Sequence, residues 1–428
     1  MTNPVVGFAG MTHLGIVSAS AVAAAGFEVV CYDPDPALVA NLRVGRLPVQ
    51  EPGLDDLVAA NGDRQSFTSS KDDLARCDVV YVSPDIATDD AGQSDDSVLR
   101  KLIDIVAGVL APDACLVVLS QVEPGFTRAM TAPAEDRRYY QVETLVFGNA
   151  VERARKPERY IVGCADPAKP LNPNFKAVLE KFGCPILTMR YESAELAKIS
   201  INCCLVASVS VANTLAELCE SIGADWSEIV PALKLDRRIG QFSYLAPGLG
   251  IAGGNLERDL ATVCRLSEAH GTDAGVVRAW IANSRHRRDW VIRTLRRLLL
   301  DRTPDARLAI WGLAYKENTH SVKNSPSLAA IAQMPDARLR VHDPVVSASL
   351  VPHRHVEACV VALEALRDAE ALLILTPWPQ YRQIAPAEIA AALKGRIVVD
   401  PYKVLDRVAV AAAGLSYYTL GQPAGSSS

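Results

Sequence analysis

Residues 5–33 read VVGFAGMTHLGIVSASAVAAAGFEVVCYD, and this stretch decides the fold. Apolar runs typical of buried strands flank a helix rich in small residues, and glycines stand at both ends of that helix. This order of elements predicts a βαβ unit, which is the opening of a doubly wound sheet. The pattern predicts a strand at 5–9, a glycine turn at 10–15, a helix at 16–25, a stop at Gly26 and a strand at 27–32.

The turn has the spacing of a dinucleotide-binding fingerprint. Gly10 permits the tight turn, Gly15 permits close packing of helix on strand, and the helix N-terminus offers N–H groups to a pyrophosphate. Asp33 ends the next strand, where it could bond both ribose hydroxyls, so NAD is favoured over NADP. The alternative is a doubly wound fold that binds no nucleotide.

Thr12 departs from this fingerprint, because it stands where a second glycine lets the phosphates approach. Its side chain either weakens NAD binding or bonds a phosphate through the hydroxyl. The residues expected at the cofactor are Gly10, Thr12, His13, Leu14, Gly15, Asp33, Ser83, Pro84, Ser120 and Gln121.

The rest of the chain predicts two Rossmann-like doubly wound α/β lobes joined by a region of long helices. We expect an NAD-binding domain at 1–192, a central helical and dimerisation domain at 193–300, a nucleotide-sugar-binding domain at 301–420 and a disordered tail at 421–428. Further strands are expected at 78–82, 115–120, 160–164, 307–311, 371–375 and 396–400, and a strand with its exit turn at 339–344. Helices are expected at 193–221, 256–270 and 273–300.

Composition limits the class of protein. The 428 residues are 49% hydrophobic and 22% charged, with a net charge of −5, which suits folded cores and argues against a nucleic-acid binder. The ten cysteines form no CxxC pair and the histidines show no metal-ligand spacing, so we expect reduced thiols in a cytoplasm, no metal and no membrane span. The basic run that begins at Arg285 is interpreted as the solvated face of a helix.

A second glycine-rich stretch, PGLGIAGGNLERD at 247–259, predicts a loop whose backbone lies close to a ligand. Gly248, Gly250, Gly253 and Gly254 are expected to wrap a base or ribose; a plain loop is the alternative.

These motifs, in this order, resemble the UDP-glucose/GDP-mannose dehydrogenase family along nearly the whole chain, to about Asp406. The matching stretches are PVQEPGL at 48–54, SQVEPG at 120–125, Glu143, Lys198 with Asn202, RIG at 238–240, the loop at 247–259 and GLAYK at 312–316 with Asn318-Thr319.

The resemblance implies that the first lobe binds NAD and the second binds a nucleotide sugar, most simply a UDP-sugar. Long helices in the middle of a chain often bridge domains or build a dimer interface, and we expect a homodimer through the central helices. The resemblance also implies that Lys198 and Asn202 handle the sugar hydroxyl and its oxyanion, and that Asp259 orders a water and pairs with Lys198. A helix cap is the alternative for Asp259, and an exposed strand-end glutamate is the alternative for Glu143, a candidate acid or base. The substrate residues implied are Arg238, Tyr244, Gly248, Gly250, Gly253, Gly254, Lys316 and Lys323.

The chain departs from the family at the sugar end. Asn255 stands where the family has the cysteine that holds the aldehyde as a thiohemiacetal and then a thioester, and an amide cannot act as that nucleophile. Neighbouring Cys203 and Cys204 point elsewhere on their helix and are not expected to replace it. Other departures are Gln121 for Thr, Phe147 for Glu, Glu257-Arg258 for Pro-Lys, His320 for Asp and Lys323 for Arg.

This pattern is compatible with three functions. The first is an NAD-dependent oxidoreductase that acts on the CH–OH group of a nucleotide sugar and does not use a cysteine thioester. The second is a redox-neutral epimerase or lyase that returns the hydride to the sugar. The third is a non-catalytic homologue that binds a nucleotide sugar.

Overall fold

The computed structural model describes residues 3–89, 92–252 and 254–423. By its internal contacts the chain divides into two compact units, Met1–Ile201 and Asn202–Ser428. The division falls inside one long helix, so the domain boundaries expected from the sequence stay predictions. The disordered tail expected at 421–428 is wrong for Gly421, whose N–H donates to Glu220 Oε1 at 2.9 Å; residues 424–428 lie outside the described part.

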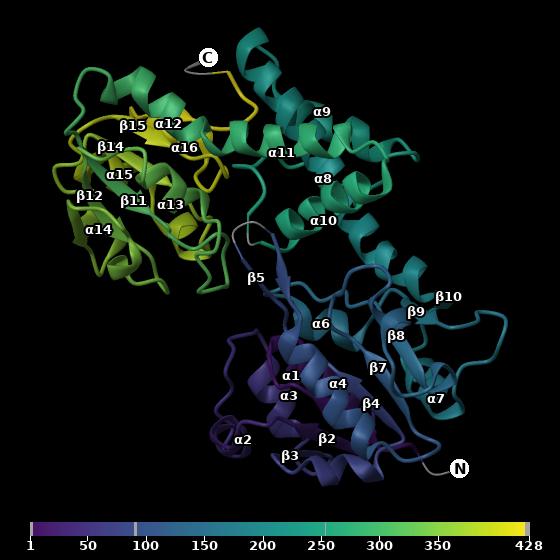
Figure 1. Cartoon of the computed structure of the whole chain (residues 1–428). Coiled ribbons are helices and arrows are strands. Elements are labelled where there is room, and N and C mark those ends of the chain that lie inside the picture. The colour runs from purple at the N-terminus through teal and green to yellow at the C-terminus, as the bar shows by residue number, and fades with distance from the viewer. Residues whose placement is uncertain (1–2, 90–91, 253, 424–428) are drawn as a thin grey trace. The chain divides into compact units, whose positions relative to one another are not determined.

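The first unit is built on an eight-stranded sheet with the order β10-β9-β8-β7-β4-β1-β2-β3 (Figure 1). Its strands pair in parallel, as predicted, except that β8 pairs with β9 antiparallel. β1, β2, β4 and β7 are short, apolar and buried at every position, as expected for a sheet covered on both faces. The strands are β1 (Val6–Ala9), β2 (Val29–Tyr32), β3 (Gln65–Thr68), β4 (Val79–Val82), β7 (Cys115–Val118), β8 (Arg138–Gln141), β9 (Tyr160–Cys164) and β10 (Ile186–Arg190).

Helices cover both faces of this sheet. Residues of α1, α3, α6 and α7 share one buried cluster, and residues of α4, η1 and the start of α8 share another. A small antiparallel hairpin, β5 (Ala87–Thr88) with β6 (Ser94–Asp95), follows β4. The helices are α1 (His13–Ala24), α2 (Pro36–Arg43), α3 (Leu54–Ala60), η1 (Lys71–Arg76), α4 (Ser97–Val109), α5 (Phe126–Ala129), η2 (Glu135–Arg137), α6 (Ala150–Arg155) and α7 (Pro173–Glu180).

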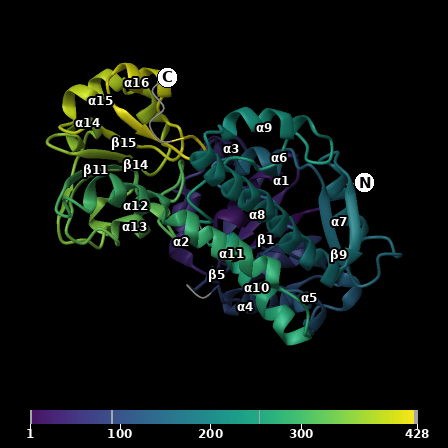
Figure 2. The ribbon, with the colours of Figure 1, turned by 90° about the horizontal axis from the view of Figure 1, so that it is seen from above.

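The central helices begin with α8 (Tyr191–Ile222), which runs from the first unit into the second. Its length and composition would suit a membrane span, but this is weak evidence, because the core helix of a soluble fold passes the same test. α8, α10 and α11 lie side by side in both views and share one apolar cluster (Figures 1 and 2). The remaining helices are α9 (Trp226–Leu235), α10 (Asn255–His270), α11 (Gly275–Arg288), α12 (Trp290–Leu295) and η3 (Arg296–Leu300).

Two predictions about this region are corrected. The single helix expected at 273–300 is interrupted at Asp289, between α11 and α12. The basic run is not a wholly solvated face, because the Arg287 side chain is fully buried, with Nη1 3.2 Å from Glu217 and Nη2 3.1 Å from Glu220. A buried guanidinium needs such partners, since an unpaired charge is costly to bury.

The second sheet has six strands in the order β13-β12-β11-β14-β15-β16, and all its neighbouring pairs are parallel. Parallel pairing and helices in the connections confirm the second doubly wound lobe. The strands are β11 (Arg307–Trp311), β12 (Arg338–His342), β13 (Val356–Ala358), β14 (Ala371–Ile374), β15 (Ile397–Val399) and β16 (Ser416–Tyr418). The helices are α13 (Pro326–Ile331), η4 (Ala348–Leu350), α14 (Ala362–Ala365), η5 (Pro379–Gln383), α15 (Pro386–Ala392) and α16 (Arg407–Ala412).

Candidate active site

The turn after β1 has the geometry that the fingerprint predicts. Gly10 has φ +97°, and a Cβ added there would lie 2.9 Å from the backbone nitrogen of Pro84. A Cβ on Gly15 would lie 1.9 Å from the Gly10 carbonyl oxygen. Only glycine therefore fits at these two positions, and α1 begins three residues after Gly10.

Asp33 lies directly after β2 and is 8% exposed. Its Oδ2 accepts the Met11 N–H at 2.8 Å, and its Oδ1 accepts the Asp35 N–H at 3.0 Å. An ionised carboxylate has about four acceptor sites, so these two bonds leave capacity for a ribose hydroxyl. The arrangement fits the role expected for Asp33.

Thr12 is the N-cap residue of α1, but its side chain does not cap its own helix. Its Oγ1 accepts the Asp85 N–H at 2.9 Å and donates to the Ser83 carbonyl at 3.4 Å. In return, Asp85 Oδ2 accepts the His13 N–H at 3.1 Å. Asp85 was not predicted from the sequence. The only features that could have indicated it are its place shortly after a buried strand and the lack of an acidic residue in the first turn of α1.

His13 is buried, and its ring is held from two sides. Its Nε2 lies 2.9 Å from Glu51 Oε2, and its ring stacks on Phe147 with 4.0 Å between centroids. Glu51 also accepts the N–H groups of Gly148 and Ala150, at 3.0 and 2.8 Å. Phe147, a departure from the family pattern, thus packs on the first residue of α1.

Two other expected cofactor residues, Ser83 and Ser120, bond backbone carbonyls at and beside this turn. The Ser83 hydroxyl donates to the carbonyls of Ala9 and Gly10 at 3.3 Å, and Ser120 Oγ donates to the Pro84 carbonyl at 2.5 Å. The Leu14 side chain is buried in the core. Direct contacts of these residues, and of Gln121, with a cofactor stay predictions.

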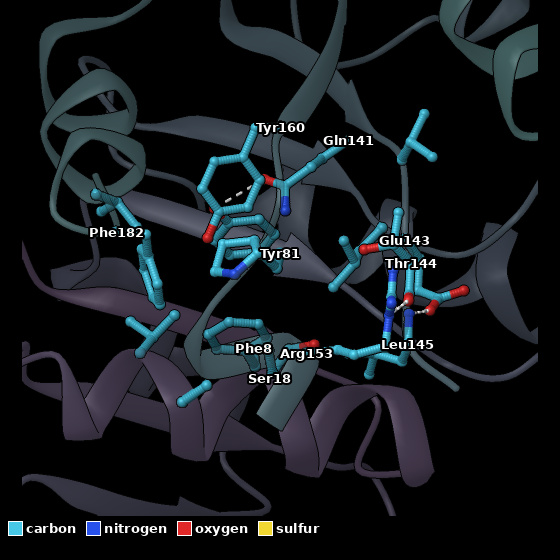
Figure 3. A pocket seen from close by; sticks show the side chains of 17 residues that line it. Phe8, Ser18, Tyr81, Gln141, Glu143, Thr144, Leu145, Arg153, Tyr160 and Phe182 are labelled. Carbon is cyan, nitrogen blue, oxygen red and sulfur yellow. Dashed lines mark hydrogen bonds between the residues drawn. The ribbon is translucent and has the colours of Figure 1, made fainter. Parts of the chain in front are cut away.

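Lys198 and Glu143 meet in the first unit. Lys198 Nζ lies 3.3 Å from Glu143 Oε2, and their side chains are 12% and 17% exposed. The other Glu143 oxygen accepts the Leu145 N–H. Figure 3 shows Glu143 and Leu145 at the edge of a cavity of about 60 Å³, which has room for a few waters but not for a dinucleotide.

Glu195, one turn before Lys198 on α8, was also missed. It is fully buried and accepts the N–H groups of Gly125 and Thr127, at 2.6 and 2.8 Å. Burial raises the pKa of this carboxyl, and the hydrogen bonds to Thr127 and Gly125 act in the opposite direction. Its only signal was an acidic residue inside an apolar helix.

In the second unit, Asn202, Arg258 and Asp259 form a buried group. Asn202 Nδ2 donates to Asp259 Oδ2 at 2.5 Å, and Arg258 Nε lies 3.1 Å from Asp259 Oδ1. Asp259 is the fifth residue of α10, whose N-cap is Gly254, so the interpretation of Asp259 as a helix cap is wrong. The implied pairing of Asp259 with Lys198 joins residues of the two units and stays a prediction.

The glycine loop leads into α10. Asn255 is the first residue of that helix and is exposed. The neighbouring Gly254 has φ +98°, and a Cβ there would lie 3.2 Å from Lys323 Cε, so the Lys323 side chain lies against the residue that precedes Asn255. A Cβ on Gly250 would lie 2.4 Å from the Ser284 carbonyl oxygen. Gly253 lies outside the described residues.

Glu257 connects this helix to two other segments of the second unit. It pairs with Arg288 of α11 at 2.8 Å and accepts a hydrogen bond from Asn324 Nδ2 in the loop before α13. The first turn of α10 is thereby tied to the loop that carries Lys316 and Lys323.

Some expected residues are not brought into a group. Arg238 is exposed and pairs with Asp236 at 2.6 Å, and Tyr244 is 53% exposed. Lys316 Nζ lies 5.6 Å from the centroid of the Tyr315 ring. The Gly248 N–H donates to Asn213 Oδ1 at 2.8 Å. Their roles at a substrate stay predictions.

Cys203 of α8 is poorly suited to replace the nucleophile that is missing at Asn255. Cys203 is partly buried against the apolar cluster of α8, α10 and α11, and burial raises the pKa of its thiol to about 11. The nucleophile would be the thiolate, which is scarce at neutral pH for such a group. In the described part of the chain, no group of three or more His, Cys, Asp or Glu side chains could hold a metal ion.

Comparison with known proteins matches all three parts of the chain to one family. Models of the UDP-glucose/GDP-mannose dehydrogenase family match its NAD binding domain at residues 5–182, its central domain at 192–285 and its UDP binding domain at 309–407.

Relatives of known name match over nearly the full length. UDP-glucose 6-dehydrogenase of Pseudomonas aeruginosa is 29% identical, with 97% of this chain and 96% of that protein covered. UDP-glucose 6-dehydrogenase TuaD of Bacillus subtilis is 27% identical, with 97% and 92% covered. A solved UDP-glucose dehydrogenase from Pyrobaculum islandicum has a TM-score of 0.83 and 26% identity, covering 99% of this chain and 98% of that one.

Proposed function

The chain belongs to the UDP-glucose/GDP-mannose dehydrogenase family, whose members are NAD-dependent nucleotide-sugar dehydrogenases, and on that premise we propose that it oxidises a CH–OH group of a UDP-sugar without a cysteine thioester. UDP-glucose is the first substrate to test, because the relatives above carry that name. The observation that carries the proposal is Asn255 at the first residue of α10, in a chain whose Lys198 Nζ lies 3.3 Å from Glu143 Oε2.

The first lobe fits NAD. The turn between Gly10 and Gly15 has no room for a Cβ at either glycine, and Asp33 keeps free acceptor sites at the end of β2. We assign the pyrophosphate to the N-terminus of α1 and the adenosine ribose to Asp33. When bound, NAD accepts a hydride from the sugar carbon.

Lys198 and Glu143 are suited to take the carbinol proton. A lysine beside a largely buried carboxylate can pass a proton to it, so the pair can accept the proton that leaves with the hydride. Asn202, one turn further along α8, has one amide N–H on Asp259 and a second available to an oxyanion. Arg258 supplies the opposite charge beside Asp259 and holds that carboxylate in place.

Asn255 changes the expected product. A thioester requires a thiolate at this position, and an amide side chain cannot form one. The reaction should therefore stop after one oxidation, at the aldehyde or ketone, or continue slowly through the hydrate. A redox-neutral epimerase or lyase is the alternative that the same residue favours, because it too dispenses with the thioester; a non-catalytic homologue would bind the sugar without turnover.

We further propose a cytoplasmic homodimer formed through the central helices. Val211, Leu215, Leu218 and Ile222 are exposed on α8, with a spacing that puts them along one stripe of the helix. A second copy of the chain would bury such a stripe. Light scattering should give twice the 46.0 kDa chain mass, and Leu218→Glu should give the single mass.

The deciding experiment is a panel of nucleotide sugars with NAD, followed by NADH absorbance and product mass. We expect NADH with a product that has lost two hydrogens, and one NADH for each sugar consumed. A changed sugar without net NADH would favour the redox-neutral alternative, and binding without turnover of any sugar would favour the non-catalytic one. An acid formed with two NADH through a covalent enzyme adduct would contradict the proposal.

Asn255→Cys is the companion variant, with Asn255→Ala as its matched control. If Asn255 occupies the nucleophile position, Asn255→Cys should form some acid and a second NADH, while Asn255→Ala should not. Equal products from both variants would show that the site has changed beyond this one side chain.

A further inference from the structure

The segment that leaves β4 is latched across the N-terminus of α1. Asp85 forms two hydrogen bonds there: its N–H donates to Thr12 Oγ1 at 2.9 Å, and its Oδ2 accepts the N–H of His13, the residue after Thr12, at 3.1 Å. The Thr12 hydroxyl also donates to the Ser83 carbonyl at 3.4 Å. Asp85 thus supplies the side-chain cap that Thr12 does not supply itself.

Asp85 occupies a backbone N–H at the start of α1 that a bound pyrophosphate would also use. Phosphates bind at a helix N-terminus because its first N–H groups lack partners within the helix and the helix dipole attracts negative charge. Here the His13 N–H is already bonded to a carboxylate, and the Met11 N–H is bonded to Asp33. The carboxylate of Asp85 therefore stands in for an anion at the position where a phosphate oxygen would accept.

We propose that Asp85 competes with the pyrophosphate of NAD for the His13 N–H, and that Thr12 holds Asp85 in that position. NAD binds after the Asp85 carboxylate has left the N–H, so Asp85 lowers the affinity of the site for its cofactor. Asp85 is exposed, so its side chain is free to turn into solvent. The inference rests on the proposed function only in taking NAD as the ligand of this turn.

The pairing also accounts for Thr12. A glycine at this position would leave the backbone N–H of Asp85 without the hydroxyl that anchors it. Thr12 and Asp85 therefore act as one unit, and their effects on NAD affinity should not add.

Calorimetric titration of NAD into the full-length protein and its variants tests the proposal. Asp85→Asn removes the charge of the side chain but keeps its shape. It should tighten NAD binding by about tenfold, because the negative carboxylate repels the negative pyrophosphate near it. Thr12→Gly should tighten it less, and the double variant should gain less than the product of the two. The gap between wild type and Asp85→Asn should narrow as salt is raised, since salt screens exposed charges.

Two controls isolate the phosphate. Asp89→Asn removes one charge from the same exposed segment, at a carboxylate that accepts the Gln93 N–H, and should leave the NAD affinity unchanged. Adenosine, which has no phosphate, should bind wild type and Asp85→Asn equally.

The outcomes separate this inference from the proposed function. Unchanged or weaker NAD binding by Asp85→Asn would overturn it, and a fall of melting temperature together with NAD affinity would show that Asp85 only caps α1. If neither protein bound NAD, both proposals would fall. If Asp85→Asn bound NAD more tightly but no nucleotide sugar were oxidised, the proposed function would fail and the role of Asp85 would stand.

Discussion

The two α/β lobes share one strand order and one glycine turn, and they differ in the segment that follows the turn. The order β3-β2-β1-β4-β7-β8 in the first corresponds to β13-β12-β11-β14-β15-β16 in the second. Gly10 and Gly312 follow the first strand of each, with φ +97° and +98°. Each donates its N–H to the last residue of the neighbouring strand, at 2.9 Å. An aspartate comes after that strand in both lobes, Asp33 and Asp343.

The difference lies in the segment after the turn. In the first lobe α1 begins at His13, so a helix N-terminus lies beside the strand ends. In the second lobe residues 312–325 form a loop before the six-residue α13. Asp343 accepts two N–H groups at the start of this loop, two just after itself and the Trp378 indole N–H. The first lobe thus keeps acceptor sites for a ligand, whereas the second uses its aspartate to shape a loop that presents lysines.

Replacing the turn glycines should have the largest effect. Gly312→Ala would place a Cβ 2.4 Å from the Thr376 Cβ, and Gly10→Ala would place one 2.9 Å from the Pro84 nitrogen. We expect the free energy of unfolding to fall by about 4 kcal/mol for Gly312→Ala and about 3 kcal/mol for Gly10→Ala, measured in urea. Gly26→Ala is the control, because Gly26 has φ +98° with nothing within 4 Å, and it should cost only about 1 kcal/mol. Equal losses in all three would mean that both turns relax around the methyl group.

Removing the strand-end aspartates should destabilise the second lobe more than the first. Asp343→Ala leaves five donors without their acceptor and should cost about 3 kcal/mol, whereas Asp33→Ala leaves two and should cost about 1–2 kcal/mol. Urea unfolding of the two variants side by side measures this difference. A larger loss for Asp33→Ala would break the comparison.

The same aspartates should differ in the opposite sense for cofactor binding. Asp33→Ser removes a charged acceptor from the ribose and should weaken NAD binding by roughly 10- to 30-fold, while NADP binding improves because the charge that repels its 2′-phosphate is gone. Asp343→Ser, its counterpart, should leave NAD affinity unchanged when measured on folded protein. NAD binding that is indifferent to Asp33→Ser would contradict the assignment of the ribose.

The smallest effect concerns pH. Burial raises the pKa of Asp400 above its ordinary value, although the backbone N–H of Leu405 and the Tyr417 hydroxyl bond its carboxylate. A carboxyl whose folded pKa exceeds its unfolded pKa stabilises the fold below the unfolded pKa, and this contribution is lost as pH rises through the folded pKa. The contribution of Asp400 to the free energy of unfolding of the wild-type protein should therefore decrease as pH rises from about 4 towards neutrality. Asp400→Asn should reduce this dependence of the unfolding free energy on pH, whereas the exposed control Asp305→Asn should leave it unchanged. Identical pH slopes for the wild-type protein and both variants would contradict the raised pKa of Asp400.

Local patterns in the sequence were sufficient for much of the fold. The strands at 160–164 and 307–311 lie where predicted. β3, β5, β6, β8, β10, β13 and β16 were missed. β10 and β13 have no fully buried position, and β3 has polar residues at three of its four positions, so these strands lack the apolar run that marks a central strand.

Residues of the candidate site were predicted where they belong to a motif of fixed spacing. They were missed where their role depends on a contact with a segment distant in the sequence. Gly10, Gly15 and Asp33 could be named because a tight turn and a strand-end carboxylate need those residue types. Asp85 and Glu195 belong to no motif, since each acts on backbone N–H groups of a distant segment. Sequence spacing says nothing about such contacts.

What the sequence by itself determined is the family, the two βαβ-built lobes and the absence of a thiol at Asn255, because glycine spacing, apolar periodicity and residue identity are all local properties of the chain. Only the tertiary structure decided that Asp85 lies on the His13 N–H, that Arg258 and Asn202 both hold Asp259, and that Arg287 is buried. These depend on which segments fold together, because a hydrogen bond or ion pair is set by distance in space and not by distance along the chain.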